Sequence, residues 1–237
     1  MLLSSSYVYN SDYLSYCRGE ILSFISNCPQ MLFVPFAYPD HDSYTDKVRR
    51  TLGDHIAITG AHTLSAESDL SKFSVIFCGG GNTFLLLTAL YDRKLLTPIR
   101  AAVMSGARYI GSSAGANIAC PSIGTTNDMP IVYPPSFDAL NLIPFNINPH
   151  YHETPPGSTH MGESRRDRIH EFIHHNHRTV VGMEEGAILL RHGDEIVLRG
   201  VRGAHIFSPG PTITERSVSP GDNLHFLVVP PADGEGQ

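Results

Sequence analysis

The chain has 237 residues, of which 41% are hydrophobic and 17% charged, and its formal net charge is −6. This length is enough for one large α/β domain, and an acidic chain without Lys/Arg clusters larger than a pair is a poor match for nucleic acid or anionic lipid. It contains no apolar run of about 18 residues and begins without a basic signal region, so we expect a cytoplasmic protein without membrane attachment. The unusual feature is 13 histidines with no tryptophan.

In the first half of the chain, β-branched or aromatic runs alternate with helical patterns. Strands are predicted at residues 31–37, 56–59, 74–78 and 108–110. Helices are predicted at residues 43–52, 82–105 and 113–119, the second interrupted near Pro98. This alternation predicts a mostly parallel central sheet with helices on both faces, which is a three-layer α/β sandwich.

The second half has a different pattern. A helix is predicted over residues 163–175, followed by a strand at 179–182. Two further runs, 187–190 and 195–198, flank a four-residue turn and predict a hairpin. Because no Pro/Gly/Ser linker divides the chain and no repeat is evident, we predict a single domain over residues 1–237.

The first candidate for chemistry is Ser113, the centre of the G-x-S-x-G sequence at residues 111–115. A β-run precedes it and a helix of small residues follows. A serine on such a turn presents its hydroxyl at the carboxyl edge of the sheet, where open α/β folds place their sites. The sequence therefore favours a nucleophile over an ordinary glycine-rich turn, and Ser113 rather than Ser112 as the reacting residue.

A second glycine turn, residues 79–81, also joins a predicted strand to a helix. In serine hydrolases, one oxyanion amide follows the nucleophile, here Ala114, and another comes from a neighbouring loop, here Gly80 or Gly81. A phosphate-binding loop is disfavoured because G-K-[ST] is absent, and Phe84 occupies the last glycine position of a dinucleotide fingerprint.

The general base that Ser113 requires is assigned to His150, which follows the apolar run ending at Pro149. A Ser–His pair of this kind is usually completed by a carboxylate that orients the histidine, and two carboxylates are candidates for this third position. Asp128 gives the Ser–Asp–His chain order of other α/β hydrolases and is slightly favoured on that ground. Glu185, which follows another predicted strand, could equally orient His150.

A competing signal is the H-E-x-x-H sequence at residues 170–174, the pattern of zinc peptidases. On a helix, His170 and His174 would share a face, with Glu171 as base. The extension that would supply a third histidine is missing, since Val180 occupies its position. We therefore expect a solvent-exposed, histidine-rich helix end and no metal site.

Together these motifs resemble the aspartyl dipeptidase (peptidase E) family of serine peptidases. The resemblance covers nearly the whole chain. Its matching segments are residues 2–5, 44–47, 79–84, 113–120, 125–132, 137–140, 147–150 and 162–165. It implies a fold like that of class I glutamine amidotransferases, which is flavodoxin-like, and a homodimer.

The resemblance also implies an activity: hydrolysis of dipeptides with an amino-terminal α-aspartyl residue, through an acyl-enzyme and without a cofactor. The family's nucleophile falls on Ser113, its base on His150, and its aspartate-recognising arginine on Arg165. We expect Asn82, beside the glycine turn, to contact the substrate as well. A guanidinium on an acidic protein suits an acidic substrate, because it clamps a carboxylate with two hydrogen bonds.

Three alternatives accompany this prediction. A cyanophycinase-like exopeptidase of the same clan would cleave β-aspartyl links. A zinc peptidase would use His170 and His174 and lose activity with a chelator. A non-catalytic ligand-binding protein would hold aspartate without turnover.

Overall fold

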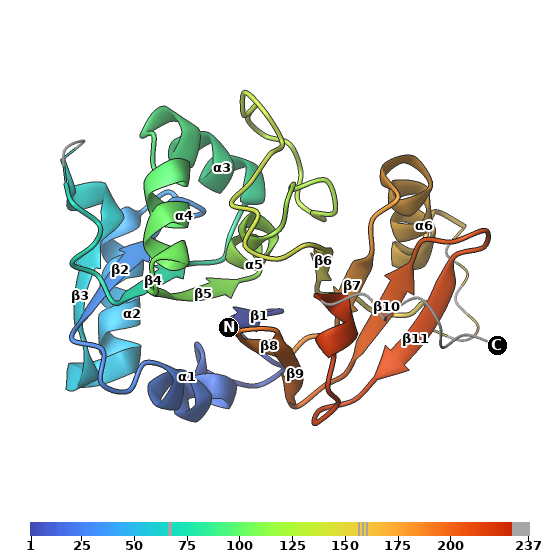
Figure 1. Cartoon of the computed structure of the whole chain (residues 1–237), viewed down its shortest axis with the longest axis horizontal. Coiled ribbons are helices and arrows are strands. Elements are labelled where there is room, and N and C mark those ends of the chain that lie inside the picture. Colours follow the sequence, from blue (N-terminus) through green and yellow to red (C-terminus); the bar gives the residue numbers. More distant parts are fainter. Residues whose placement is uncertain (66–67, 156, 158, 160, 229–237) are drawn as a thin grey trace.

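The computed structural model describes residues 1–65, 68–155, 157, 159 and 161–228, which form two β-sheets (Figure 1). In spatial order, the larger sheet contains β3 (Ala57–Gly60), β2 (Gln30–Val34), β4 (Val75–Cys78), β5 (Arg108–Ser112), β1 (Leu2–Leu3), β8 (Ala187–His192) and β9 (Glu195–Gly200). The five strands from β3 to β1 are parallel, and β8 and β9 are antiparallel. The predicted α/β class with a mostly parallel central sheet is confirmed.

Helices cover both faces of this sheet because its strands are apolar on both sides. Successive side chains of a strand point to opposite faces. On β2, accordingly, Met31 and Phe33 pack with α1 (Arg18–Phe24) and α2 (His41–Leu52). Leu32 and Val34 face the opposite layer. That layer consists of α3 (Thr83–Asp92), α4 (Leu96–Met104) and α5 (Ala114–Ala119).

The smaller sheet lies beyond β9 in Figure 1 and carries α6 (Arg165–Asn176). Its strands, in spatial order, are β11 (Thr214–Val218), β10 (Ala204–Ser208), β7 (Val180–Met183) and β6 (Asn146–Pro149). Ile169 and Ile173 of α6 pack on Val180 and Phe207 of this sheet. The largest core cluster contains apolar side chains from both sheets. That the chain forms one domain stays a prediction.

Local chemistry explains where the observed boundaries differ from the predicted ones. The β2 strand ends at Val34, before Pro35, rather than at residue 37. The α2 helix begins at His41 rather than at residue 43 because Asp40 is the cap, accepting a 3.0 Å hydrogen bond from the Ser43 amide. Four elements had no predicted counterpart: α1, β1, β10 and β11. The described 3-10 turns are Ser15–Cys17, Gly53–His55, Ala61–Thr63 and His225–Leu227.

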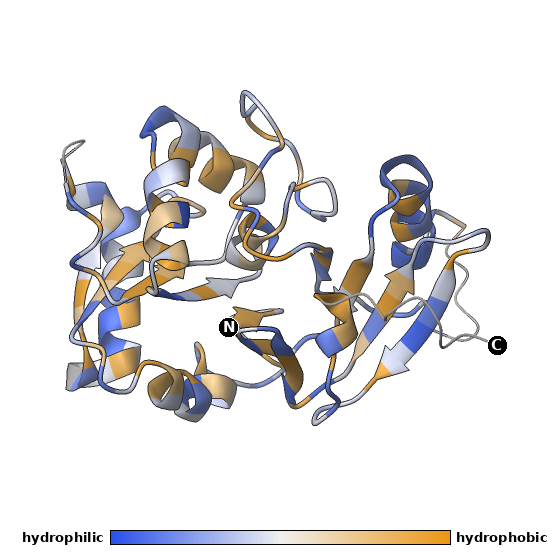
Figure 2. Cartoon of the chain, in the orientation of Figure 1, coloured by the Kyte–Doolittle hydropathy of each residue, from blue (hydrophilic) through white to orange (hydrophobic). Residues whose placement is uncertain are grey.

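The hydropathy of the elements follows their burial (Figure 2). The central strands are apolar, whereas α6 and β11 carry many polar residues. None of the helices in the described part of the chain has the length and apolarity of a membrane span. All four cysteines are free and buried, and burial raises the pKa of the Cys78 and Cys120 thiols to about 12. These two thiols are therefore poor nucleophiles.

Candidate active site

Ser113 lies on the turn between β5 and α5, in a backbone conformation that few residues adopt. Its φ is +50° and its ψ is −106°. The flanking glycines permit this turn, because a Cβ on Gly111 would lie 2.4 Å from the Gly115 carbonyl oxygen, and one on Gly115 would lie 2.1 Å from that of Cys78. The G-x-S-x-G sequence thus corresponds to a strained elbow that holds one serine at the carboxyl edge of the sheet.

The two adjacent serines have different surroundings. Ser112 is completely buried, and its Oγ is 2.7 Å from the Oγ of Ser6. Ser113 is partly exposed, and its Oγ is 2.9 Å from Nε2 of His150. Of the two, only Ser113 therefore combines access to solvent with a base.

His150 directly follows β6 and is held from its backbone. It has a φ of +55°, and its amide donates a 3.1 Å hydrogen bond to Oγ of Ser4, which in turn donates to the Met183 carbonyl. The side-chain amide of Asn127 donates to the Pro149 carbonyl at 2.8 Å. These contacts fix the main chain on both sides of the imidazole.

The second nitrogen of this imidazole contacts a carboxylate. Nδ1 of His150 is 3.0 Å from Oε1 of Glu185, which lies in the turn after β7. Parallel pairing brings them together, since Pro149 of β6 is opposite Met183 of β7. The segments that follow β6 and β7 therefore leave the sheet at the same edge. Ser113, His150 and Glu185 are thus connected in series.

Asp128, the alternative third member, makes different contacts. Its Oδ2 accepts hydrogen bonds from the Thr83 amide at 2.8 Å and from the Thr83 hydroxyl at 2.6 Å. Thr83 is the first residue of α3, so the carboxylate lies at a helix amino terminus, where negative charge is favourable. Chain order therefore does not identify the partner of His150.

The glycine turn at residues 79–81 lies against Ser113. A Cβ on Gly80 would lie 3.3 Å from the Cβ of Ser113. The amides of Gly80, Gly81 and Ala114 donate no hydrogen bond within the described residues. These three amides are available to an oxyanion beside Ser113.

The side chain of Asn82 forms hydrogen bonds within the protein. Its Oδ1 caps α3 by accepting from the amides of Phe84 and Leu85, at 3.0 and 3.1 Å. Its Nδ2 donates to the Met129 carbonyl at 2.9 Å. Both ends of this side chain are thus engaged within the protein.

Arg165 is the first residue of α6 and is half-buried. Burial lowers the pKa of its guanidinium, Arg168 lowers it further, and the negative charge of Asp128 raises it. Among the described residues, Arg165 forms no ion pair within 4.0 Å. A partly desolvated guanidinium without a carboxylate partner is suited to bind an anionic ligand.

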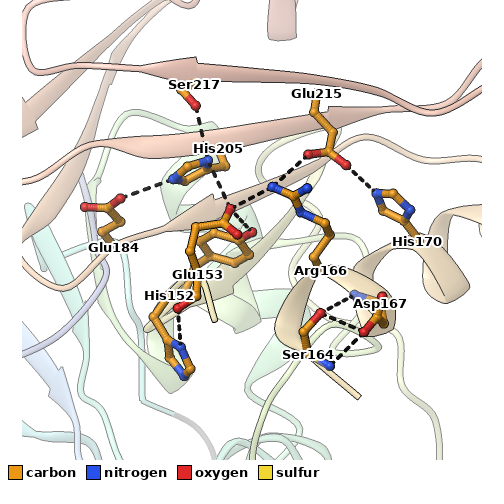
Figure 3. Close-up of polar contacts among 11 residues, drawn as sticks. His152, Glu153, Ser164, Arg166, Asp167, His170, Glu184, His205, Glu215 and Ser217 are labelled. Carbon is orange, nitrogen blue, oxygen red and sulfur yellow. Dashed lines mark hydrogen bonds and ion pairs between the residues drawn. The ribbon is translucent and has the colours of Figure 1, made fainter. Parts of the chain in front are cut away.

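A second polar cluster holds the start of α6 against the smaller sheet (Figure 3). Arg166, next to Arg165, donates to Glu153 at 3.1 Å and lies 3.3 Å from Glu215. Hydrogen bonds with Glu153 are the main cause that raises the pKa of Arg166. Tyr151 also donates to Glu153, at 2.6 Å. The segment that follows His150 is thereby tied to the helix turn that presents Arg165.

The same cluster extends to the turn that carries Glu185. His205 of β10 is 3.1 Å from Oε1 of Glu184 and 3.7 Å from Oε1 of Glu153 (Figure 3). One polar network therefore connects the segments bearing His150, Arg165 and Glu185. Sequence reasoning missed this network, because neither Glu153 nor His205 belongs to a recognisable motif.

The H-E-x-x-H sequence lies within α6, and its first histidine contacts the smaller sheet. Nε2 of His170 is 2.8 Å from Oε1 of Glu215 on β11, and the side chain of His174 is exposed. Among the residues described by the structure, no group of three or more His, Cys, Asp or Glu side chains could hold a metal ion. The described contacts of His170 are those of a side chain packed on the smaller sheet.

The sequence of this chain is similar to those of known peptidases. The model of Peptidase family S51 matches residues 1–199. The chain is 45% identical over 233 residues to a "Probable alpha-aspartyl dipeptidase" of Drosophila melanogaster, covering 96% of each chain. It is 44% identical to "Peptidase E" of Streptomyces coelicolor, covering 96% of this chain and 94% of that one.

The chain belongs to peptidase family S51. The resemblance inferred from its motifs is thereby confirmed. The fold of this S51 peptidase is shared by a solved peptidase from an acI-B1 actinobacterium, with a TM-score of 0.70, 18% identity and 94% coverage of both chains. Ser4, whose Oγ accepts from the His150 amide, is a further residue that sequence reasoning did not single out. The available signal was its place in the matching segment at residues 2–5.

Proposed function

We propose that this chain is a cytoplasmic, cofactor-independent serine dipeptidase that hydrolyses dipeptides with an amino-terminal α-aspartyl residue. One observation carries the proposal: Ser113, His150 and Glu185 are joined by contacts of 2.9 and 3.0 Å. The names of the relatives, alpha-aspartyl dipeptidase and Peptidase E, support the substrate class. A homodimer is implied by the family resemblance alone.

In this proposal, Oγ of Ser113 attacks the carbonyl carbon that follows the substrate's aspartyl residue. Its proton passes to Nε2 of His150, and the amides of Ala114 and of Gly80 or Gly81 bind the resulting oxyanion. His150 then gives the proton to the leaving amine as the C–N bond breaks. A water molecule, deprotonated by His150, attacks the acyl-enzyme ester and releases aspartate, while the proton returns to Ser113.

The carboxylate of Glu185 orients His150 and stabilises the imidazolium formed during this transfer. Replacing Glu185 with glutamine removes the charge while keeping the size of the side chain. We expect kcat to fall by about 10²–10⁴-fold with little change in KM, because the interaction strengthens only when His150 is charged. Steady-state kinetics measure this split, and an unchanged kcat would exclude Glu185 from the triad.

A panel of substrates tests the proposed specificity. We expect hydrolysis of Asp-Leu, at least about 100-fold slower hydrolysis of Leu-Leu, and no hydrolysis of the β-linked β-Asp-Leu or β-Asp-Arg. Preferential cleavage of the β-linked peptides would instead identify a cyanophycinase-like exopeptidase. Activity should persist in a chelator, and a loss that added zinc restores would support the His170/His174 alternative.

A further inference from the structure

The amino-terminal residue of the proposed substrate carries two opposite charges on neighbouring carbons. The side-chain carboxylate of an aspartyl residue is matched by Arg165, but the α-ammonium lies one carbon from the carbonyl that Ser113 attacks. Burying that ammonium without an anionic partner is costly. If the proposed function holds, the site therefore needs a carboxylate near Ser113 that is not already paired with Arg165.

Asp128 lies in a segment that contacts both the start of α3, after the glycine turn, and the end of β6, before His150. On one side, its Oδ2 is bound to Thr83, two residues after Gly81. On the other side, the neighbouring Asn127 donates to the Pro149 carbonyl, directly before His150. The carboxylate is thus held between the glycine turn and the end of β6.

Only one of the two carboxylate oxygens of Asp128 is hydrogen-bonded within the described residues. Its Oδ2 accepts both bonds from Thr83 and lies 3.2 Å from the Thr126 hydroxyl, whereas its Oδ1 has no hydrogen-bond partner within the described residues. Asp128 lies close enough to Arg165 to raise the pKa of that guanidinium, although burial lowers it overall. The described residues nevertheless include no Asp128–Arg165 pair within 4.0 Å. An anion and a cation are therefore near each other without being paired.

The other carboxylates around the site are committed to different partners. Glu185 binds Nδ1 of His150, on the side of the ring away from Ser113. Glu184 faces His205, and Glu153 accepts from Tyr151 and Arg166. Of these four described carboxylates, Asp128 is the one bound to Thr83, two residues after Gly81.

We propose that Asp128 is a specificity-determining residue whose free Oδ1 accepts a hydrogen bond from the substrate's α-ammonium group. Asp128 and Arg165 together recognise the two charges of an amino-terminal aspartyl residue. The enzyme consequently requires a free amino terminus, and it rejects an otherwise identical ligand that lacks the amine.

A binding cycle tests this assignment in the full chain carrying Ser113→Ala, which cannot turn the ligands over. The ligands are Asp-Leu and succinyl-leucine, which differs from Asp-Leu only by lacking the amine. Asp128→Asn is the informative change, because its amide oxygen can still accept from the Thr83 amide while the charge is lost. Asp128→Ser is the second variant, and Asp138→Asn, an exposed carboxylate of the same segment, is the matched control.

Calorimetry should show that removing the amine weakens binding by about 10- to 100-fold when Asp128 is present. Asp128→Asn should weaken the binding of Asp-Leu by a similar factor, but the binding of succinyl-leucine by less than about threefold. The two changes should therefore be strongly non-additive. Asp138→Asn should leave both affinities unchanged.

Equal weakening of both ligands by Asp128→Asn and by Asp128→Ser would overturn the proposal and leave Asp128 as a helix cap only. So would an affinity that does not depend on the amine when Asp128 is present. Hydrolysis of Asp-Leu by the unsubstituted enzyme separates the two hypotheses. If that hydrolysis is absent, the proposed function fails; if it is present and the cycle is additive, only the role of Asp128 fails.

Discussion

Ser113→Ala is expected to reduce kcat/KM for Asp-Leu by about 10⁴–10⁶-fold. The alanine keeps the backbone of the elbow but removes the hydroxyl oxygen that forms the acyl-enzyme in the proposed mechanism. At 1.36 kcal/mol for each factor of ten, this loss corresponds to about 5–8 kcal/mol of transition-state stabilisation. Steady-state assays, with a fluorophosphonate label located by mass spectrometry, measure both consequences.

Ser112→Ala is the matched control, because Ser112 is the adjacent residue of the same type. Its Oγ is buried against Ser6 and does not face the imidazole. We expect this variant to retain activity within about tenfold and to remain labelled at Ser113, since it loses only one hydrogen bond beneath the turn. Full activity in Ser113→Ala, or a label on Ser112, would show that the nucleophile is misassigned.

Arg165→Ala is expected to reduce kcat/KM for Asp-Leu by about 10³-fold and to abolish the preference for an acidic first residue. The half-buried guanidinium has no ion-pair partner among the described residues, so the substrate's carboxylate can occupy its donors. Losing this contact leaves the carboxylate desolvated and unpaired. Arg165→Lys should give an intermediate loss, because an ammonium cannot form the two parallel hydrogen bonds.

The ratio of kcat/KM for Asp-Leu to that for Asn-Leu is the informative measurement for Arg165. It should be large in the unsubstituted enzyme and approach one in Arg165→Ala. Arg168→Ala is the control from the same helix, since that side chain is exposed and its described ion pair, with Glu163, is long at 3.7 Å. A ratio unchanged by Arg165→Ala, or equally reduced by Arg168→Ala, would contradict the assignment.

Much of this molecule follows from local sequence. Alternating apolar runs and helical patterns predict the parallel sheet, because a strand that is apolar on both faces must be covered on both. The G-x-S-x-G motif identifies the elbow because only glycine tolerates the close approaches at residues 111 and 115. His150 is identified by its place directly after a strand. These are short-range properties of the chain, which neighbouring residues determine.

The partners of these residues depend on contacts that no local pattern encodes. From the sequence, either Asp128 or Glu185 could orient His150, and only the chain order slightly favours Asp128. The pairing of β6 with β7, which places Pro149 opposite Met183, instead brings Glu185 to the imidazole. The H-E-x-x-H sequence has the spacing of a metal site, yet His170 contacts Glu215, 45 residues away. Local sequence therefore indicated the candidate nucleophile, Ser113, and the candidate base, His150. Strand register and the packing of α6 decided which carboxylate each histidine meets, because such contacts join segments whose separation along the chain carries no periodic signal.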